Sequence, residues 1–177
     1  MRKTENKTRF DQYDETEWLK IAYDYDTDGY VVMHKAHGSN ERRANLAIAF
    51  SLMKRGETVE LLPVSTQQSV KSLDATRDGM AWEFKTSKTP NGKNAVQSAI
   101  KHASAQKAEN LLISVRVEHT NQDIIDGVFA AFHDGRAKCI QTLEFLFEDE
   151  NSIVLTREQI DGQEFEAVLL NHKRQLN

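Results

Sequence analysis

Short apolar runs alternate with amphipathic segments along this sequence, which is the pattern of an α/β protein. Apolar residues spaced three and four apart predict helices, and short runs of β-branched, aromatic and aliphatic residues predict strands. The predicted helices cover 40–55, 94–107 and 121–133, and the predicted strands cover 19–25, 30–35, 58–63, 74–77, 80–83, 111–117, 140–148 and 153–156.

The two ends of the chain carry weaker signals. Residues 1–9 are polar and mixed in charge, which predicts a frayed tail. Residues 10–18 place aromatic residues among acids, as in a short helix or a segment lying across the core. Residues 157–161 favour a short helix, and the apolar residues of 165–170 are expected either to close the sheet or to pack on it.

The segment from Lys71 to Thr86 predicts a β-hairpin turned by Asp78-Gly79. Asp-Gly is favoured in a two-residue type I′ turn, because both central residues need a positive φ. With this turn the rungs pair 77 with 80, 76 with 81, 75 with 82 and 74 with 83. Asp74 then lies opposite Glu83, and strand alternation puts Lys85 on the same face as Glu83.

The predicted rung between Asp74 and Glu83 is chemically informative. Directly opposed side chains have Cβ atoms roughly 4.5–5.5 Å apart, and two carboxylates at that separation repel each other. A fold tolerates the repulsion most easily when a cation lies between them. Two carboxylates completed by phosphate oxygens are a usual way to hold Mg²⁺. The pattern therefore predicts a divalent metal at this rung, with Lys85 beside it.

The spacing D-x(8)-E-x-K over Asp74, Glu83 and Lys85 resembles the signature of the PD-(D/E)XK nuclease superfamily, with Leu73 where the signature has Pro. The string D-A-T-R-D-G-M-A-W-E-F-K more narrowly resembles the C-terminal nuclease domain of contact-dependent inhibition toxins, which often cleave tRNA, and of similar phage and mobile-element proteins. The resemblance extends more loosely over 40–115. It implies a restriction-endonuclease-like core, a central mixed β-sheet flanked by helices in the order α-β-β-β-α-β, here with an N-terminal hairpin extension.

The resemblance also implies an activity, the metal-dependent hydrolysis of phosphodiester bonds in RNA such as tRNA, or in DNA. Asp74 and Glu83 would bind Mg²⁺ or Mn²⁺, with Zn²⁺ as an alternative, and the metal would lower the pKa of an attacking water. Lys85 would orient that water or stabilise the transition state. A toxin of this kind would also have an immunity protein as a partner.

Glu41 is the candidate third catalytic carboxylate, bound to metal directly or through water. Domains of the resembled family carry an acidic residue on the helix before the first core strand, and Glu41 matches that position. Its spacing to Ala44, Ile48 and Leu52 predicts a place on the core-facing stripe of this helix. The alternative is a favourable charge at the helix N-terminus, worth under about 1 kcal/mol. Asn45, one turn on, is a candidate polar neighbour, and His34 and His37 are expected at the surface.

Lysines are concentrated after the hairpin. Between Phe84 and Ala108 there are five lysines and no acidic residue, although the formal net charge of the chain is −4. A solvated helix face is one interpretation, and contact with nucleic-acid phosphates is the other. The candidate substrate-binding residues are Lys88, Lys93, Gln97, Lys101 and Gln106.

Length and composition fit a single domain over 1–177, in which 1–39 is an extension, 40–117 the catalytic core and 118–177 completes the sheet. No apolar run approaches the roughly 18 residues of a membrane span. The N-terminus has no apolar stretch after its charges, so we expect no secretory signal and a cytoplasmic site of action. A lone Cys139 cannot form an intramolecular disulfide.

Other interpretations stay open on the sequence. The same fold could bind nucleic acid or protein without cutting it, and an immunity-type binding protein would suit the acidic net charge. Residues 24–29 match the first half of a calcium-binding loop, but Lys35 stands where the twelfth position needs Glu. A hairpin turned by Asp28-Gly29 is the favoured interpretation of that segment.

Overall fold

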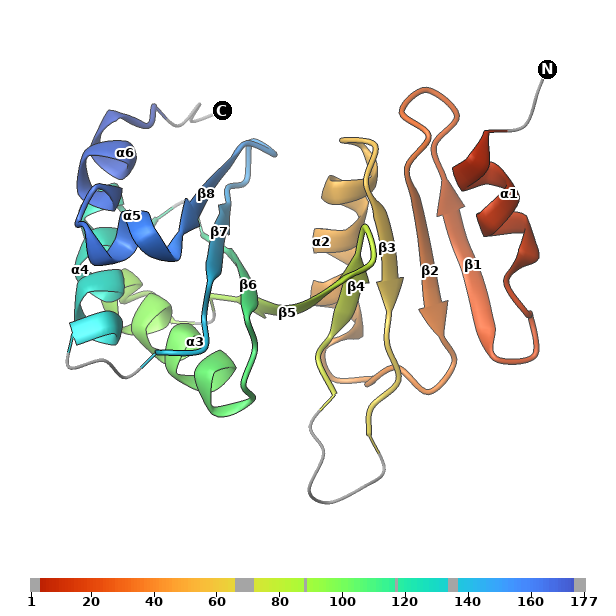
Figure 1. Ribbon diagram of the computed structural model, residues 1–177, viewed down its shortest axis with the longest axis horizontal. Helices are drawn as coiled ribbons and strands as arrows, with labels where there is room; N and C mark the ends of the chain where they lie inside the picture. Colours follow the sequence, from red (N-terminus) through yellow and green to blue (C-terminus); the bar gives the residue numbers. More distant parts are fainter. Residues whose placement is uncertain (1–3, 66–71, 88, 117, 134–136, 174–177) are drawn as a thin grey trace. The chain divides into compact units, whose positions relative to one another are not determined.

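The computed structural model describes residues 4–65, 72–87, 89–116, 118–133 and 137–173, so that Lys71 and Lys88 lie outside the described residues. The chain divides into two compact units, residues 1–82 and 83–177, which are described one at a time (Figure 1). In the described ranges the strands pair in sequence order from β1 to β8, and helices flank them. The mixed α/β class predicted from the sequence is confirmed. None of the helices in these ranges is long and apolar enough to cross a bilayer.

In its described residues, 4–65 and 72–82, the first unit consists of a sheet and two helices. Its elements are α1 (Glu5–Gln12), β1 (Trp18–Tyr23), β2 (Tyr30–His34), α2 (Arg42–Met53), β3 (Thr58–Leu61), β4 (Ala75–Arg77) and the beginning of β5 (Met80–Thr86). β2 and β3 are parallel, the other strand pairs given for this unit are antiparallel, and α2 forms the crossover that a parallel pair requires. A frayed tail was predicted for 1–9, of which 1–3 lie outside the described residues. For 4–9 the prediction is wrong, because Thr4 caps α1 by accepting a hydrogen bond from the backbone N–H of Lys7.

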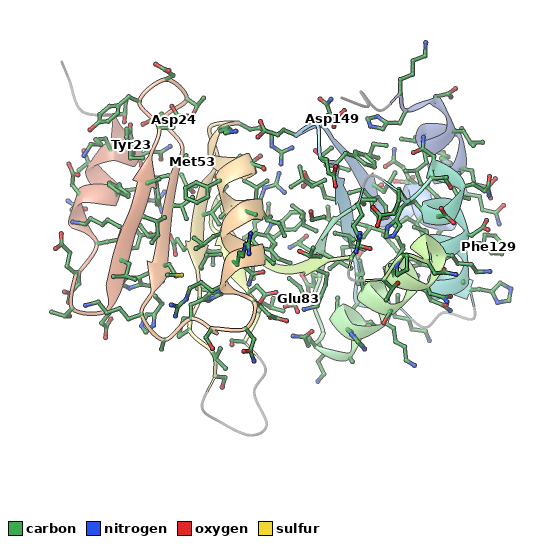
Figure 2. All side chains as sticks on the ribbon, turned by 180° about the vertical axis from the view of Figure 1, so that it is seen from behind. Tyr23, Asp24, Met53, Glu83, Phe129 and Asp149 are labelled. Carbon is green, nitrogen blue, oxygen red and sulfur yellow. The ribbon has the colours of Figure 1, made fainter. Side chains whose placement is uncertain are left out.

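The N-terminal hairpin of β1 and β2 is confirmed, with its connection at residues 24–29. The last rung pairs Tyr23 with Tyr30, and Asp24 opens the loop by accepting hydrogen bonds from two backbone N–H groups (Figure 2). Gly29 closes it where no side chain fits, since a Cβ there would lie 2.2 Å from the carbonyl oxygen of Met53. The end of α2 therefore rests directly on this loop.

The central hairpin has the predicted turn. Asp78 and Gly79 have φ values of 47° and 79°, as a type I′ turn requires. The register pairs 77 with 80, 76 with 81 and 75 with 82, as predicted. The turn is also tied to β3, because Asp78 Oδ1 accepts hydrogen bonds from the Thr58 N–H at 2.9 Å and the Thr58 hydroxyl at 3.0 Å. Trp82 is buried, as expected of a core residue.

The second unit contains a sheet and four helices in its described residues. It continues β5 and adds α3 (Gly92–Ala105), β6 (Asn110–Ser114), α4 (Asn121–Phe132), β7 (Thr142–Leu146), β8 (Ser152–Thr156), α5 (Arg157–Asp161) and α6 (Phe165–Asn171). The strands β5, β6 and β7 are parallel, and β8 is antiparallel to β7. Residues 165–170 are helical and pack on α4, so they add no strand.

The core of the second unit is built on β6. Leu111, Leu112 and Ile113 are fully buried, as their continuous apolar run predicted. The helices α3 and α4 approach closely, because a Cβ at Gly127 would lie only 2.7 Å from the Cβ of Val96. From α2 to β6 the element order is helix, three strands, helix, strand, which is the order that the sequence predicted.

Candidate functional site

Asp74 lies in the first unit, immediately before β4. Its carbonyl oxygen accepts a hydrogen bond from the backbone N–H of Leu62 at 2.9 Å. Its carboxylate Oδ1 accepts a hydrogen bond from Asn45 Nδ2 at 3.3 Å. Asp74 is half-buried. The two hydrogen bonds hold its backbone and its side chain in place.

The residue that holds the Asp74 carboxylate is itself part of a buried polar pair. Asn45 is 2% exposed, and its Nδ2 atom lies 3.3 Å from His37 Nε2. His37 is 5% exposed, and its Nδ1 atom lies 2.6 Å from the carbonyl oxygen of Leu62. The expectation that His37 lies at the surface is wrong, because the carbonyl and the amide satisfy both ring nitrogens in the interior.

Glu41 does not lie on the core-facing stripe that the sequence predicted. It is the exposed N-cap residue of α2, and its side chain makes no capping hydrogen bond. The helix itself begins at Arg42, so Glu41 precedes its first turn. The buried stripe consists of Asn45, Ile48, Ala49 and Leu52. The inward-facing polar group of α2 is thus the amide of Asn45.

Glu83 and Lys85 lie together in the second unit. Glu83, labelled in Figure 2, is 0% exposed, and the Lys85 ammonium donates a hydrogen bond to Glu83 Oε1. The register with β6 pairs Glu83 with Leu111 and Lys85 with Ile113, which puts both charged side chains on one face of β5. A buried carboxylate is costly unless it is paired, and Lys85 supplies the opposite charge.

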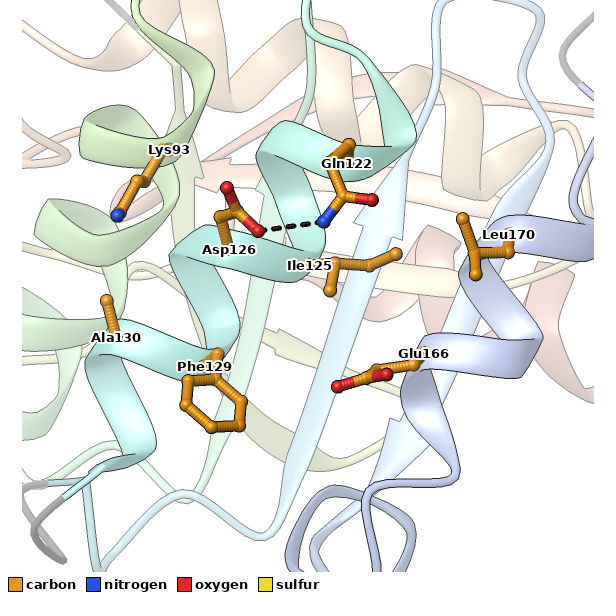
Figure 3. Close-up of a pocket in the computed structure, with 8 residues that line it drawn as sticks. All are labelled: Lys93, Gln122, Ile125, Asp126, Phe129, Ala130, Glu166 and Leu170. Atoms are coloured by element: carbon orange, nitrogen blue, oxygen red, sulfur yellow. Dashed lines mark hydrogen bonds between the residues drawn. The ribbon is translucent and has the colours of Figure 1, made fainter.

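Lys93 lines a groove of about 390 Å³ between α3, α4 and α6 (Figure 3). Asp126 and Glu166 bring two carboxylates to the same groove, and Asp126 accepts a hydrogen bond from Gln122 at 2.8 Å. A phosphate near Lys93 would therefore also meet negative charge. Phe129 and Leu170, both well exposed, supply much of its apolar wall.

Gln97 and Lys101 line a second groove, of about 280 Å³, together with Ser104 and several alanines of α3, α4 and the following turn. With Lys93 they form a stripe of four-residue spacing on α3, on the side that meets α4. Neither groove is lined by Glu83 or Lys85. Gln106 is the half-buried C-cap residue of α3, and Lys88 lies outside the described residues.

Sequence reasoning missed a buried pair formed by Ser87 and His119. His119 Nε2 lies 2.8 Å from the carbonyl oxygen of Thr89, which can only accept, so this nitrogen carries the proton. His119 Nδ1 then accepts from the hydroxyl of Ser87 at 3.1 Å. The pair ties the end of β5 to the segment before α4. Nothing in its local spacing marks His119, since its contacts lie about thirty residues away.

Carboxylate oxygens suit a hard cation such as Mg²⁺, although the described residues bring few carboxylates together at one place. In residues 4–65, 72–87, 89–116, 118–133 and 137–173, no group of three or more His, Cys, Asp or Glu side chains is arranged to hold a metal. Mg²⁺ is commonly bound by one or two carboxylates, with substrate phosphates and water completing its shell. Carboxylates such as those of Asp74 and Glu83 fit that mode and do not fit an all-protein metal cage.

The comparisons with known proteins bear on the same segment. A family model described as the contact-dependent growth inhibition CdiA C-terminal domain matches residues 71–151. This part of the chain, less than half of it, resembles a toxin domain. It includes Asp74, Glu83 and Lys85.

Among solved structures, the chain is similar to a CdiA-CT/CdiI toxin and immunity complex from Burkholderia pseudomallei. The two are 18% identical, the match covers 65% of this chain and 83% of that chain, and the TM-score is 0.47. No match is found among curated proteins.

Proposed function

We propose that this chain is a toxin-type nuclease that hydrolyses phosphodiester bonds with the help of a divalent metal, with RNA such as tRNA as the first candidate substrate and DNA as the second. The observation that carries the proposal is the buried Glu83–Lys85 ion pair, on the strand that follows the type I′ turn. It lies within 71–151, the segment that matches the CdiA C-terminal domain.

The strand arrangement supports the same proposal. Antiparallel pairing of β3, β4 and β5, followed by a helix and the parallel strand β6, is what a restriction-endonuclease-like core would require. The hairpin register runs as far as the rung between Ala75 and Trp82. That Asp74 lies opposite Glu83 is what the sequence predicts from their spacing across the turn, and our proposal includes it.

Each residue has a proposed role. Asp74 and Glu83 would hold Mg²⁺ or Mn²⁺, with Zn²⁺ as an alternative, and Glu41 would contribute through water from the exposed start of α2. When bound, the ion supplies charge stabilisation for the phosphate and lowers the pKa of the attacking water. Lys85, which donates a hydrogen bond to Glu83, would orient the attacking water or stabilise the charge that develops on a phosphate oxygen.

The partners follow from the activity. A cell that makes a growth-inhibiting nuclease needs protection from it, so we include an immunity protein among the proposed partners, beside the nucleic acid. The proposed site of action is the cytoplasm, where tRNA is found.

The test is cleavage of a panel of total tRNA, plasmid and single-stranded DNA, each with Mg²⁺, with Mn²⁺ and with chelator. We expect Asp74→Asn, Glu83→Gln and Lys85→Met to lower the cleavage rate at least about 100-fold, since each removes a group that acts on the transition state. Glu158→Gln, at an exposed carboxylate of α5 that lines neither groove, is the matched control and should cleave normally. Undiminished cleavage in Asp74→Asn and Lys85→Met would remove both residues from the mechanism, and an inert wild-type chain would favour a binding module.

A further inference from the structure

The hydrogen-bond partners of His37 fix its tautomer. The carbonyl oxygen of Leu62, 2.6 Å from Nδ1, can only accept, so Nδ1 carries the proton. In the neutral ring Nε2 is then an acceptor, and the 3.3 Å contact from Asn45 Nδ2 is an N–H···N hydrogen bond. Both ring nitrogens are satisfied with the imidazole neutral.

The two neighbours of Asn45 fix the orientation of its amide. One N–H of Nδ2 points to His37 Nε2, and the other points to Asp74 Oδ1 at 3.3 Å. Both neighbours are acceptors, so a flipped amide would set its oxygen against a lone pair and a carboxylate. The amide is therefore held as a donor toward Asp74.

The contacts form a closed circuit in the first unit. Leu62 accepts from His37 through its carbonyl and donates to the carbonyl of Asp74 through its N–H at 2.9 Å. Arg42 Nη2 donates to the backbone carbonyl of His37 at 3.2 Å, which ties the backbone at His37 to α2. Because His37 and Asn45 are almost fully buried, water does not compete for these hydrogen bonds.

A satisfied polar pair in the core is the simplest alternative explanation. Burying an amide and an imidazole is costly, and an apolar residue at position 45 would extend the stripe of Ile48 and Leu52. The polar pair nevertheless ends on one particular group, the carboxylate of Asp74. The amide of Asn45 is also a neutral donor, so this hydrogen bond adds no negative charge beside the carboxylate of Asp74.

We infer that His37 and Asn45 are positioning residues, a relay that orients the carboxylate of Asp74 to bind a divalent cation. The inference rests on the proposed role of Asp74 as a metal ligand. The relay acts through the orientation of the carboxylate, since neither His37 nor Asn45 needs to touch metal or substrate. Groups that orient metal ligands in this way change metal affinity by about 10- to 100-fold when they are removed.

The experiment compares Mn²⁺ affinity, measured by calorimetry without substrate, in the full chain and its variants. Asn45→Leu keeps the volume of the side chain and removes the donor, so we expect Mn²⁺ affinity to fall about tenfold or more. His37→Gln can still offer an acceptor at the place of Nε2 and should retain most of the affinity. His37→Asn reaches Leu62 but is too short to reach Asn45, and should behave like Asn45→Leu.

A second measurement needs no metal. In the metal-free protein, nitrogen NMR of His37 should show the Nδ1–H tautomer, and the side-chain carboxyl signal of Asp74 should shift in Asn45→Leu. Thermal unfolding identifies any variant that is not folded. If a variant is not folded, the test of the relay is the tautomer of His37 in the wild type. Nε2–H in the wild type, or wild-type Mn²⁺ affinity in folded Asn45→Leu, overturns the relay.

These outcomes separate the relay from the proposed function. If Asp74→Asn abolishes Mn²⁺ binding while Asn45→Leu leaves it unchanged, the proposed function stands and the relay is wrong. If wild type and Asp74→Asn bind Mn²⁺ equally, Asp74 is not a metal ligand, and both the proposed metal role and the relay toward it are wrong.

Discussion

At the scale of single residues, the first unit holds a phenol in an unusual environment. Tyr13 donates a hydrogen bond to the carboxylate of Glu60, and its hydroxyl lies 3.4 Å from that of Tyr30. Burial, followed by the hydrogen bonds to Glu60 and Tyr30, raises the pKa of Tyr13 far above its usual range. The carboxylate of Glu60 thus accepts a hydrogen bond from Tyr13 inside the first unit.

The raised pKa of Tyr13 predicts a loss of stability in alkali. Above about pH 10 the unfolded chain releases the phenolic proton while the folded chain keeps it, so unfolding becomes more favourable as the pH rises. Urea unfolding between pH 8 and pH 11 should show this fall in the wild type and a smaller fall in Tyr13→Phe. Tyr25→Phe, at a 70% exposed position, should follow the wild type, and identical curves for all three would contradict the prediction.

His119 offers a second prediction at this scale. Its loss leaves the hydroxyl of Ser87 and the carbonyl of Thr89 without their buried partner, which costs about 1–3 kcal/mol for such groups. We therefore expect His119→Ala to lower the free energy of unfolding by at least that amount, measured by denaturant titration. His102→Ala, at an exposed position of α3, should change it by less than about 0.5 kcal/mol. Similar effects of the two substitutions would show that the buried contacts contribute nothing.

At the scale of elements, the hairpin turn depends on backbone conformation more than on space. No atom lies within 4 Å of a Cβ built at Gly79, so a side chain there would meet no neighbour. The φ of 79° is nevertheless a left-handed conformation that costs most residues roughly 1–2 kcal/mol. Gly79→Ala should destabilise the protein by about that amount, and Gly79→Asn by less, because Asn tolerates this region. Equal stability of the two variants, measured by thermal unfolding, would count against this explanation.

The elements also show how far the sequence alone could lead. The turn at 78–79 and the strand at 110–114 were predictable, because Asp-Gly and a continuous apolar run are local signals. Asn45 was predicted as a polar neighbour of the site, and its contact with Asp74 agrees with that. The inward position of Glu41 was predicted wrongly, because Glu41 continues the apolar spacing but precedes the first residue of the helix. The burial of His37 depends on Leu62, a partner 25 residues away, which no local pattern reveals.

At the scale of the whole molecule, the candidate residues fall on both sides of a boundary inside one strand. Residues 80–82 of β5 pair with β4 in the first unit, and residues 83–86 pair with β6 in the second. Asp74 belongs to the first set, and the Glu83–Lys85 pair to the second. The proposed ligands, Asp74 and Glu83, are therefore related by their spacing of nine residues across a tight turn. That spacing can be read directly from the sequence.

Charge along the whole chain gives the last prediction. A net charge of −4 disfavours nucleic acid in general, so binding must depend on local basic groups. Lys93 shares its groove with Asp126 and Glu166, whereas Lys101 lies among small side chains. The field at Lys101 is therefore more attractive to phosphate, and Lys101→Gln should weaken tRNA binding more than Lys93→Gln.

Fluorescence anisotropy with labelled tRNA would measure this difference in the Asp74→Asn background without metal, so that cleavage does not interfere. Each lysine that neutralises one phosphate should change the slope of log affinity against log salt by roughly 0.7–0.9. We expect Lys101→Gln to reduce the slope by about that amount and Lys93→Gln to reduce it by less. A larger loss of slope in Lys93→Gln would contradict this prediction. The carboxylates of its groove could then not face the bound phosphates, and RNA would have to contact α3 near its N-terminus.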